Sequence, residues 1–122
     1  MSLDWRRFTI AVDRSGTLIG CGQIKPHGDG SYELASIAVQ ASWRHKGIAS
    51  AIIQHLLEAQ PLPIYLTCQE GLDKYYMKFG FRELTPAELT PYFQHIYQII
   101  KWLRRLRLLR HKLHFMVLES AD

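Results

Sequence analysis

Cysteines, long apolar runs and metal-ligand patterns are scarce in this chain. Its 122 residues include two cysteines, Cys21 and Cys68, whose spacing matches neither a disulfide framework nor a zinc site. The longest apolar run is well short of the ~20 residues of a membrane-spanning helix. The N-terminus lacks the apolar stretch of a signal peptide, and the six histidines show no metal-ligand spacing. We therefore expect a reduced, cytoplasmic protein without a metal.

Acidic residues are missing from the one segment where positive charge is concentrated. The net charge is +4, from 15 Lys and Arg against 11 Asp and Glu. Six of these cations lie between Lys101 and Lys112, so nine remain to face the eleven acids in the rest of the chain. Because the excess belongs to one segment, the composition does not indicate a nucleic-acid-binding protein as a whole.

Apolar periodicity predicts a single α/β domain over residues 1–122. Strand patterns cover residues 8–12, 18–24, 32–39, 64–67, 81–84 and 114–118, and helical patterns cover 48–59 and 72–79. Residues 86–112 are predicted as one long or broken amphipathic helix. The order ββ-β-α-β-α-β-α-β is typical of helices packed on a mixed sheet. The predicted parts are a hairpin over 1–30, a core over 31–84, the basic helical segment over 85–112 and a last strand over 113–119.

The loop over residues 44–49 joins a predicted strand to the first turn of a predicted helix. Free backbone N–H groups and the positive end of the helix dipole converge at such a junction, and Gly47 lets an anion approach the main chain. Arg44, His45 and Lys46 add positive charge. The loop therefore predicts a site for an anionic group such as phosphate, with a generic strand-to-helix turn as the alternative.

Two motifs and their separation make the chain resemble the GCN5-related N-acetyltransferase (GNAT) superfamily over about residues 32–84. The loop that follows Val39 fits the family's acetyl-CoA loop, Arg/Gln-x-x-Gly-x-Gly/Ala. The run Tyr76-Met77-Lys78-Phe79-Gly80-Phe81 fits its Tyr-x-Lys-x-Gly-Phe element. The resemblance implies a mixed, mostly antiparallel twisted sheet flanked by helices, with splayed central parallel strands. It also implies that the family's first strand and two N-terminal helices are missing here, and that an extra basic helix precedes the last strand.

The same resemblance implies acetyl-CoA as the cosubstrate and an unidentified amine as the acceptor. Backbone groups of the third strand would pair with the pantetheine arm, and main-chain amides of the loop would hold the pyrophosphate. Gln69 departs from the family's usual Asn in the turn that opens the second helix. The expected cofactor-binding residues are Ile37, Ala38, Val39, Arg44, His45, Lys46, Gly47, Ile48, Ala49, Ser50 and Gln69.

Two residues are candidates for proton transfer. An amine with a pKa near ~10 must lose a proton before it attacks, and the departing thiolate benefits from gaining one. The resemblance places Tyr76 at the family's usual general-acid position and Glu33 where several members carry a catalytic glutamate. Strand alternation predicts that Glu33 shares a face with Ala35, Ile37 and Val39. The alternatives are a packing role for Tyr76 and a solvated strand position for Glu33.

The predicted function is N-acetyl transfer from acetyl-CoA to a primary amine of a small molecule or peptide, by direct attack in a ternary complex. A two-step transfer through Cys68 is the alternative mechanism, although a small buried cysteine is expected there. The alternative function is a non-catalytic module that binds CoA or acts through the basic segment.

The basic segment has several interpretations. One interpretation is that it forms a wall of the acceptor site. A second is that it docks a partner such as a second copy of the chain. A third is that its basic face binds an anionic membrane or nucleic acid. The simplest alternative is a solvated charged face on a helix that packs on the core. We expect this last role, and neither a membrane nor a nucleic acid as a partner.

Overall fold

The computed structural model describes residues 7–119, and its elements follow the predicted order. The elements are β1 (Phe8–Val12), β2 (Leu18–Pro26), β3 (Tyr32–Val39), α1 (Ile48–Glu58), β4 (Ile64–Gln69), α2 (Asp73–Met77), β5 (Arg82–Glu83), α3 (Pro91–Arg105) and β6 (Leu113–Leu118). Two short 3-10 turns, η2 (Ala41–Trp43) and η3 (Pro86–Glu88), precede α1 and α3. Within the described residues, no helix has the length and apolar character needed to cross a membrane.

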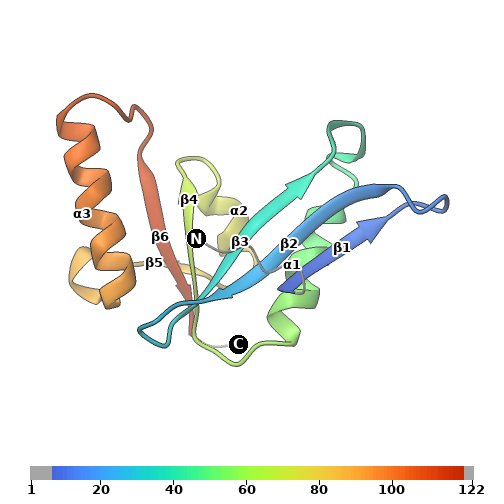
Figure 1. Cartoon of the computed structure of the whole chain (residues 1–122), viewed down its shortest axis with the longest axis horizontal. Helices are drawn as coiled ribbons and strands as arrows, with labels where there is room; N and C mark the ends of the chain where they lie inside the picture. The colour runs from blue at the N-terminus through green and yellow to red at the C-terminus, as the bar shows by residue number, and fades with distance from the viewer. Residues whose placement is uncertain (1–6, 120–122) are drawn as a thin grey trace.

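Six strands form one sheet in the order β1-β2-β3-β4-β6-β5 (Figure 1). All neighbouring strands run antiparallel except β3 and β4, which are parallel. These two strands share one register pair, Glu33 with Tyr65, and then diverge. Figure 1 shows the result as a V, with β1, β2 and β3 in one arm and β4 and β6 in the other. The predicted mixed sheet with splayed central strands is confirmed.

A β-bulge in β3 changes the faces that its side chains occupy. Ser36 has a φ of 59°, and the register between β2 and β3 shifts beside it. As a result, Leu34 and Ile37 both pack against the core beneath α1. Glu33 faces the opposite side of the sheet. The prediction that Glu33 shares a face with Ile37 and Val39 is therefore wrong, because strict alternation ends at the bulge.

Two hydrophobic clusters cover the two faces of the sheet. On one face, α1 and α2 pack on the sheet through a core that includes the fully buried Ile53, Ile64 and Met116. On the other face, Phe93 of α3 packs against Phe115 of β6, with ring centroids 6.2 Å apart. α3 is therefore a core-packed helix on the face opposite α1 and α2.

The helical segment before the last strand is broken and ends earlier than predicted. η3 and α3 are separate, and α3 stops at Arg105. Arg107 has a φ of 61°, and the N–H of Leu108 donates to the carbonyl of Leu103 at 2.9 Å, which closes the helix end. Helical leucine spacing continues to Leu113, but this residue begins β6. The chain has to reverse before β6 can pair with β4, and that requirement overrides the local pattern.

Asp29, in the turn between β2 and β3, caps the start of α3. Its carboxylate accepts the N–H of Tyr92 at 2.8 Å, and also the N–H and hydroxyl of Ser31 at 2.9 and 2.6 Å. Thr90 occupies the N-cap position but makes no side-chain cap bond. In the same turn, His27 stacks on the ring of Tyr92, with centroids 3.5 Å apart. The turn between β2 and β3 thus fixes where α3 begins.

We expect Asp29→Ala to lower the free energy of unfolding at neutral pH by about 1 kcal/mol, because it removes the cap. Burial acts to raise the pKa of Asp29, but hydrogen bonds from Ser31 and Tyr92 outweigh it and hold that pKa well below the usual 3.8. The contribution of the ionised carboxylate is therefore present above pH ~4 and disappears as the pH falls below that value.

Urea unfolding followed by circular dichroism, at neutral pH and in acid, tests this prediction. The difference between the wild type and Asp29→Ala should be clear at neutral pH and should shrink in acid. Asp29→Asn keeps an acceptor oxygen without the charge, so it serves as the matched control with a smaller loss. An equal difference at both pH values would show that an ionised cap is not involved.

Candidate functional site

The loop between β3 and α1 presents a row of backbone N–H groups without partners. Along the described chain, the amides from His45 to Ser50 donate to no protein acceptor, and the first bond of the helix is from Ala51 N–H to Gly47 O at 3.1 Å. His45 and Gly47 have φ values of 63° and 82°. A Cβ on Gly47 would meet no atom within 4 Å, so its backbone conformation is what favours glycine.

Three exposed basic side chains accompany these amides. The Nε of Arg44 donates to the carbonyl of Val39 at 3.3 Å, which holds the guanidinium beside the end of β3. The Nζ of Lys46 lies 5.0 Å from the centre of the Trp43 ring, within cation–π range. His45 is the third. Free amides at a helix N-terminus, together with this charge, suit an anionic group such as a phosphate.

The gap between β3 and β4 begins beside this loop. Gln40 N–H donates to Ile19 O at 2.8 Å across β2 and β3. Backbone groups alternate in direction along an antiparallel pair, so those of Ala38 point to β2. Those of Ile37 and Val39 point away from β2, into the gap. Two of the three predicted strand positions therefore offer backbone groups to an extended ligand.

Tyr76 lies on the face covered by α1 and α2, and Figure 1 shows α2 behind the opening of the V. The rings of Tyr75 and Phe81 lie 5.3 and 6.1 Å from its own. Burial raises the pKa of Tyr76 to about 12, and Cys68 and Tyr75 add to the shift. The phenol therefore keeps its proton at neutral pH. The neighbouring Tyr75 has its hydroxyl hydrogen-bonded to the hydroxyl of Ser50 at 2.9 Å.

Glu33 lies at the closed end of the gap, on the opposite face from Tyr76. Its side chain is 15% exposed, and its carboxylate is 2.8 Å from the Nε2 of His27. His27 in turn stacks on Tyr92 of α3. The sequence assigned no role to His27, because only the folded turn between β2 and β3 brings it to Glu33. The two candidate proton-transfer residues thus lie on opposite faces of the sheet.

The remaining predicted residues lie around the same opening. Ile48 packs against the core at the start of α1, and Ala49 beside it is half-buried. The hydroxyl of Ser50 is engaged by Tyr75. Gln69 is exposed at the end of β4, on the other arm of the V, where its carbonyl accepts the N–H of Leu72 at 3.1 Å. Both arms therefore contribute candidate residues.

The sequence profile of the acetyltransferase (GNAT) domain matches residues 4–83, well over half of the chain. No curated protein sequence matches the chain. Within the described residues, no group of three or more His, Cys, Asp or Glu side chains is placed to hold a metal ion.

Several solved structures share the fold at low sequence identity. N-acetylglutamate synthase from Neisseria gonorrhoeae, complexed with coenzyme A and N-acetyl-glutamate, is 17% identical with a TM-score of 0.73; the match covers 93% of this chain but 25% of that one. Rv2747 from Mycobacterium tuberculosis, in complex with CoA and NLQ, is 19% identical with a TM-score of 0.69, over 93% of this chain and 76% of that one. A GNAT-family acetyltransferase from Staphylococcus aureus is 16% identical with a TM-score of 0.66, over 92% and 66% of the two chains. The domain profile and the shared fold show that this chain belongs to the GNAT acetyltransferase family.

Proposed function

We propose that this domain binds acetyl-CoA and transfers its acetyl group to a primary amine of a small molecule or peptide. The row of free amides from His45 to Ser50, at the edge of the gap between β3 and β4, carries this proposal. The amides suit the pyrophosphate of CoA. The backbone groups of Ile37 and Val39 suit a pantetheine arm that lies along β3 as an extra strand would. The structures of N-acetylglutamate synthase and Rv2747, which share this fold, contain CoA.

In this proposal the thioester lies at the closed end of the gap, between Glu33 and Tyr76. Glu33 accepts a proton from the ammonium group of the acceptor, directly or through a water molecule. The free amine attacks the thioester carbonyl, and the C–S bond breaks as the tetrahedral intermediate collapses. Tyr76 gives its proton to the departing thiolate. The nitrogen loses its second proton as the amide forms, and that proton returns to the Tyr76 phenolate through water. The phenol holds a proton to give, because burial raises its pKa to about 12.

Direct attack is favoured over a two-step transfer by the state of Cys68. This residue is 7% exposed, and burial raises the pKa of its thiol to about 11. The nucleophile in thiol chemistry is the thiolate, which is scarce at neutral pH when the pKa is that high. A covalent acetyl-cysteine intermediate is therefore not part of the proposal.

α3 supplies the wall of the acceptor side in this scheme. It packs on the face of the sheet that holds Glu33, opposite α1 and α2. Its residue Tyr92 stacks on His27, which contacts Glu33, so the helix is joined to the proposed base through one side chain. The ring of Tyr65, which is partly exposed and packs on the buried Phe93 with centroids 5.4 Å apart, adds an apolar surface beside it.

The first test is cofactor binding. We expect CoA at a hundred times its Kd to raise the free energy of unfolding by ~2.7 kcal/mol, and so to raise the melting temperature. Arg44→Glu with Lys46→Glu should weaken CoA binding, because both cations flank the free amides. Arg107→Glu with Arg110→Glu, in the exposed turn after α3, makes the same charge change on the other arm of the V and is the matched control. No thermal shift with either CoA or acetyl-CoA would rule the proposal out.

The second test distinguishes Tyr76, the proposed general acid, from the adjacent Tyr75. We expect Tyr76→Phe to lower kcat by about 100-fold or more while the Kd for CoA stays close to wild type, because it removes the proton donor only. Tyr75→Phe is the matched control, since its hydroxyl is bonded to Ser50 and should affect turnover far less. The value of kcat is measured from the release of free CoA thiol when acetyl-CoA and each amine of a panel are mixed with the protein. Equal effects of the two substitutions would remove Tyr76 from the mechanism.

The third test concerns the base. We expect Glu33→Gln to lower kcat/KM by about 100-fold at neutral pH, because the amide keeps a contact with His27 but takes no proton. The defect should shrink at high pH, where the acceptor amine is deprotonated without help. A pH–rate profile of the variant that runs parallel to that of the wild type would count against Glu33 as the base.

A chain that binds CoA but acetylates no amine in the panel would instead support the non-catalytic module.

A further inference from the structure

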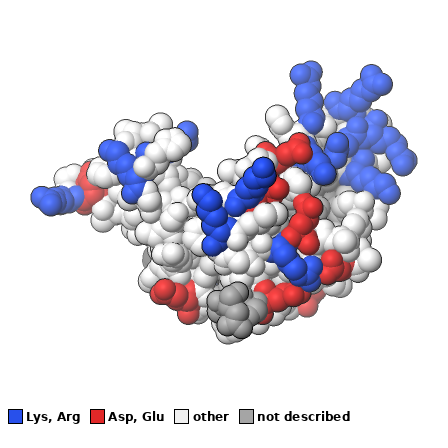
Figure 2. Space-filling view, turned by 180° about the vertical axis from the view of Figure 1, so that it is seen from behind, with Lys and Arg blue, Asp and Glu red and all other residues white. Residues whose placement is uncertain are grey.

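Most of the cations between Lys101 and Lys112 line one cleft, which lies between α3 and the β5–β6 edge of the sheet. Figure 2 shows cations gathered at one corner of the molecule, over the end of α3. Arg107 and Arg110 are exposed in the turn after α3, outside the cleft, and fit the expected solvated charged face. The four cations that line the cleft are Lys101, Arg104, Arg105 and Lys112.

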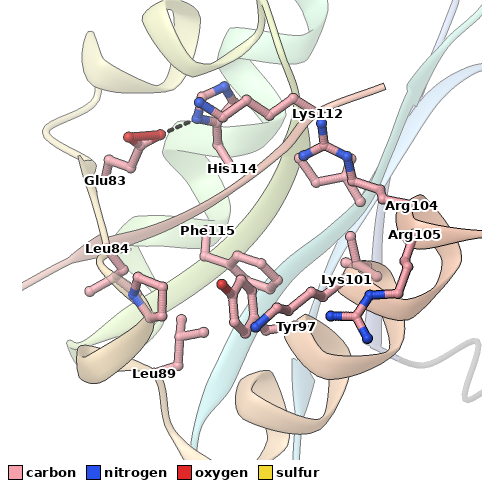
Figure 3. A pocket seen from close by; sticks show the side chains of 13 residues that line it. Glu83, Leu84, Leu89, Tyr97, Lys101, Arg104, Arg105, Lys112, His114 and Phe115 are labelled. Atoms are coloured by element: carbon pink, nitrogen blue, oxygen red, sulfur yellow. Dashed lines mark hydrogen bonds and ion pairs between the residues drawn. The ribbon is translucent and has the colours of Figure 1, made fainter. Parts of the chain in front are cut away.

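The floor of this cleft is apolar. Tyr97 of α3 and Phe115 of β6 lie there, with ring centroids 6.1 Å apart. Figure 3 shows Leu84 and Leu89 on one side of the two rings and the three cations of α3 on the other. The cleft therefore has a cationic end and an apolar end.

The charge of the cleft is not neutralised by an ion pair within the described residues. The ion pairs there join Arg82, His27 and His114 to glutamates, and none involves a cation of the cleft. Glu83 lines the cleft, but its carboxylate is engaged by His114. Like charges around one cavity repel one another, and the walls of a cleft focus their field. An anion in the cleft would relieve that repulsion.

We propose that this cleft binds a small organic anion, which is a phosphate monoester or a carboxylate attached to an apolar ring or chain. The volume of the cleft is ≈ 620 Å³, which is typical of a small-molecule site. The forked guanidinium groups of Arg104 and Arg105 suit the paired oxygens of either anion. The two lysines add charge from α3 and from the start of β6. The apolar part of the ligand would cover the aromatic floor.

Other anions use only part of this cavity. A nucleic acid presents its phosphates along an extended backbone and would leave the aromatic floor uncovered. Inorganic phosphate would fill the cationic end alone. A second copy of the chain would bring two sets of unpaired cations together, and these would repel. A small anion that carries an apolar group matches both ends of the cleft.

The cleft is separate from the opening between β3 and β4. In the order of the sheet, β4 and β6 lie between β3 and β5. The lining of the cleft includes neither Glu33 nor Tyr76, and it includes none of the expected cofactor-binding residues. The proposal is therefore independent of acetyl transfer, because a domain that only binds CoA would have the same cleft.

Isothermal titration calorimetry with naphthyl phosphate, naphthoate and inorganic phosphate tests the proposal. We expect at least one of the two naphthyl anions to bind at a single site, at least about tenfold more tightly than inorganic phosphate, because its ring covers the aromatic floor. Binding should weaken as salt is raised. Naphthylmethanol, which keeps the ring without the charge, should bind at least about tenfold less tightly than the naphthyl anion.

Two pairs of substitutions place the anion. Arg104→Gln with Arg105→Gln should weaken binding of the naphthyl anion at least about tenfold, because charge-assisted hydrogen bonds are lost. Arg107→Gln with Arg110→Gln removes the same charge outside the cleft, so this matched control should bind as the wild type does. All four side chains are exposed, and circular dichroism checks that each variant is folded.

Three kinds of result would overturn the proposal. The first is no binding of either naphthyl anion, or equal affinity for the naphthyl anions and inorganic phosphate. The second is an equal loss of binding in the two arginine pairs, or a loss in Arg44→Gln with Lys46→Gln alone, which would assign the anion to the loop before α1. The third is tighter binding of hexaglutamate or duplex DNA, which would assign the cleft to a macromolecule.

Discussion

The parting of β3 from β4 is the constraint on which the rest of this structure depends. Parallel strands that stay paired leave no opening in a sheet, and here pairing stops after Glu33 and Tyr65. The bulge at Ser36 lies just beyond that pair. Each arm of the V is held by its own neighbours, β2 on one side and β6 on the other. An opening in the middle of the sheet is stable because both arms are anchored independently.

The opening joins two environments that differ in chemistry. On the α1 and α2 face, burial raises the pKa values of Tyr76 and Cys68. On the α3 face, Glu33 is held by the imidazole of His27. The free amides at the start of α1 sit at the open end, where an anionic ligand would enter.

α3 shows how one helix serves three surfaces. Phe93 packs it on the sheet, and Asp29 caps it from a distant turn. A second side faces β5 and β6 across a cleft lined by Lys101, Arg104 and Arg105, and a third side exposes Ile99, Trp102 and Leu106. Because the packed side and the cap already fix the helix in place, its outer side is free to serve another contact.

The local features of this protein follow from its sequence alone. The bounds of β1 and β3, the start of α1 at Ile48 and the turn at Gly47 are those that apolar periodicity and glycine predict. Apolar residues mark where these elements begin and end, although the bulge at Ser36 interrupts the alternation within β3. The GNAT motifs also lie within single strand–loop–helix units, so the family was predictable from adjacent residues.

The tertiary structure decided which residues meet. The bulge at Ser36 moved Glu33 to the face opposite Ile37, because strand pairing rather than alternation sets side-chain direction there. The pairing of β6 with β4 ended α3 early, although the leucine spacing runs on. The folded turn between β2 and β3 brings the imidazole of His27 into contact with the carboxylate of Glu33. The exposure of Trp102 was equally hidden, because a helical pattern shows that an apolar side chain lies on a face but only distant packing determines whether anything covers it.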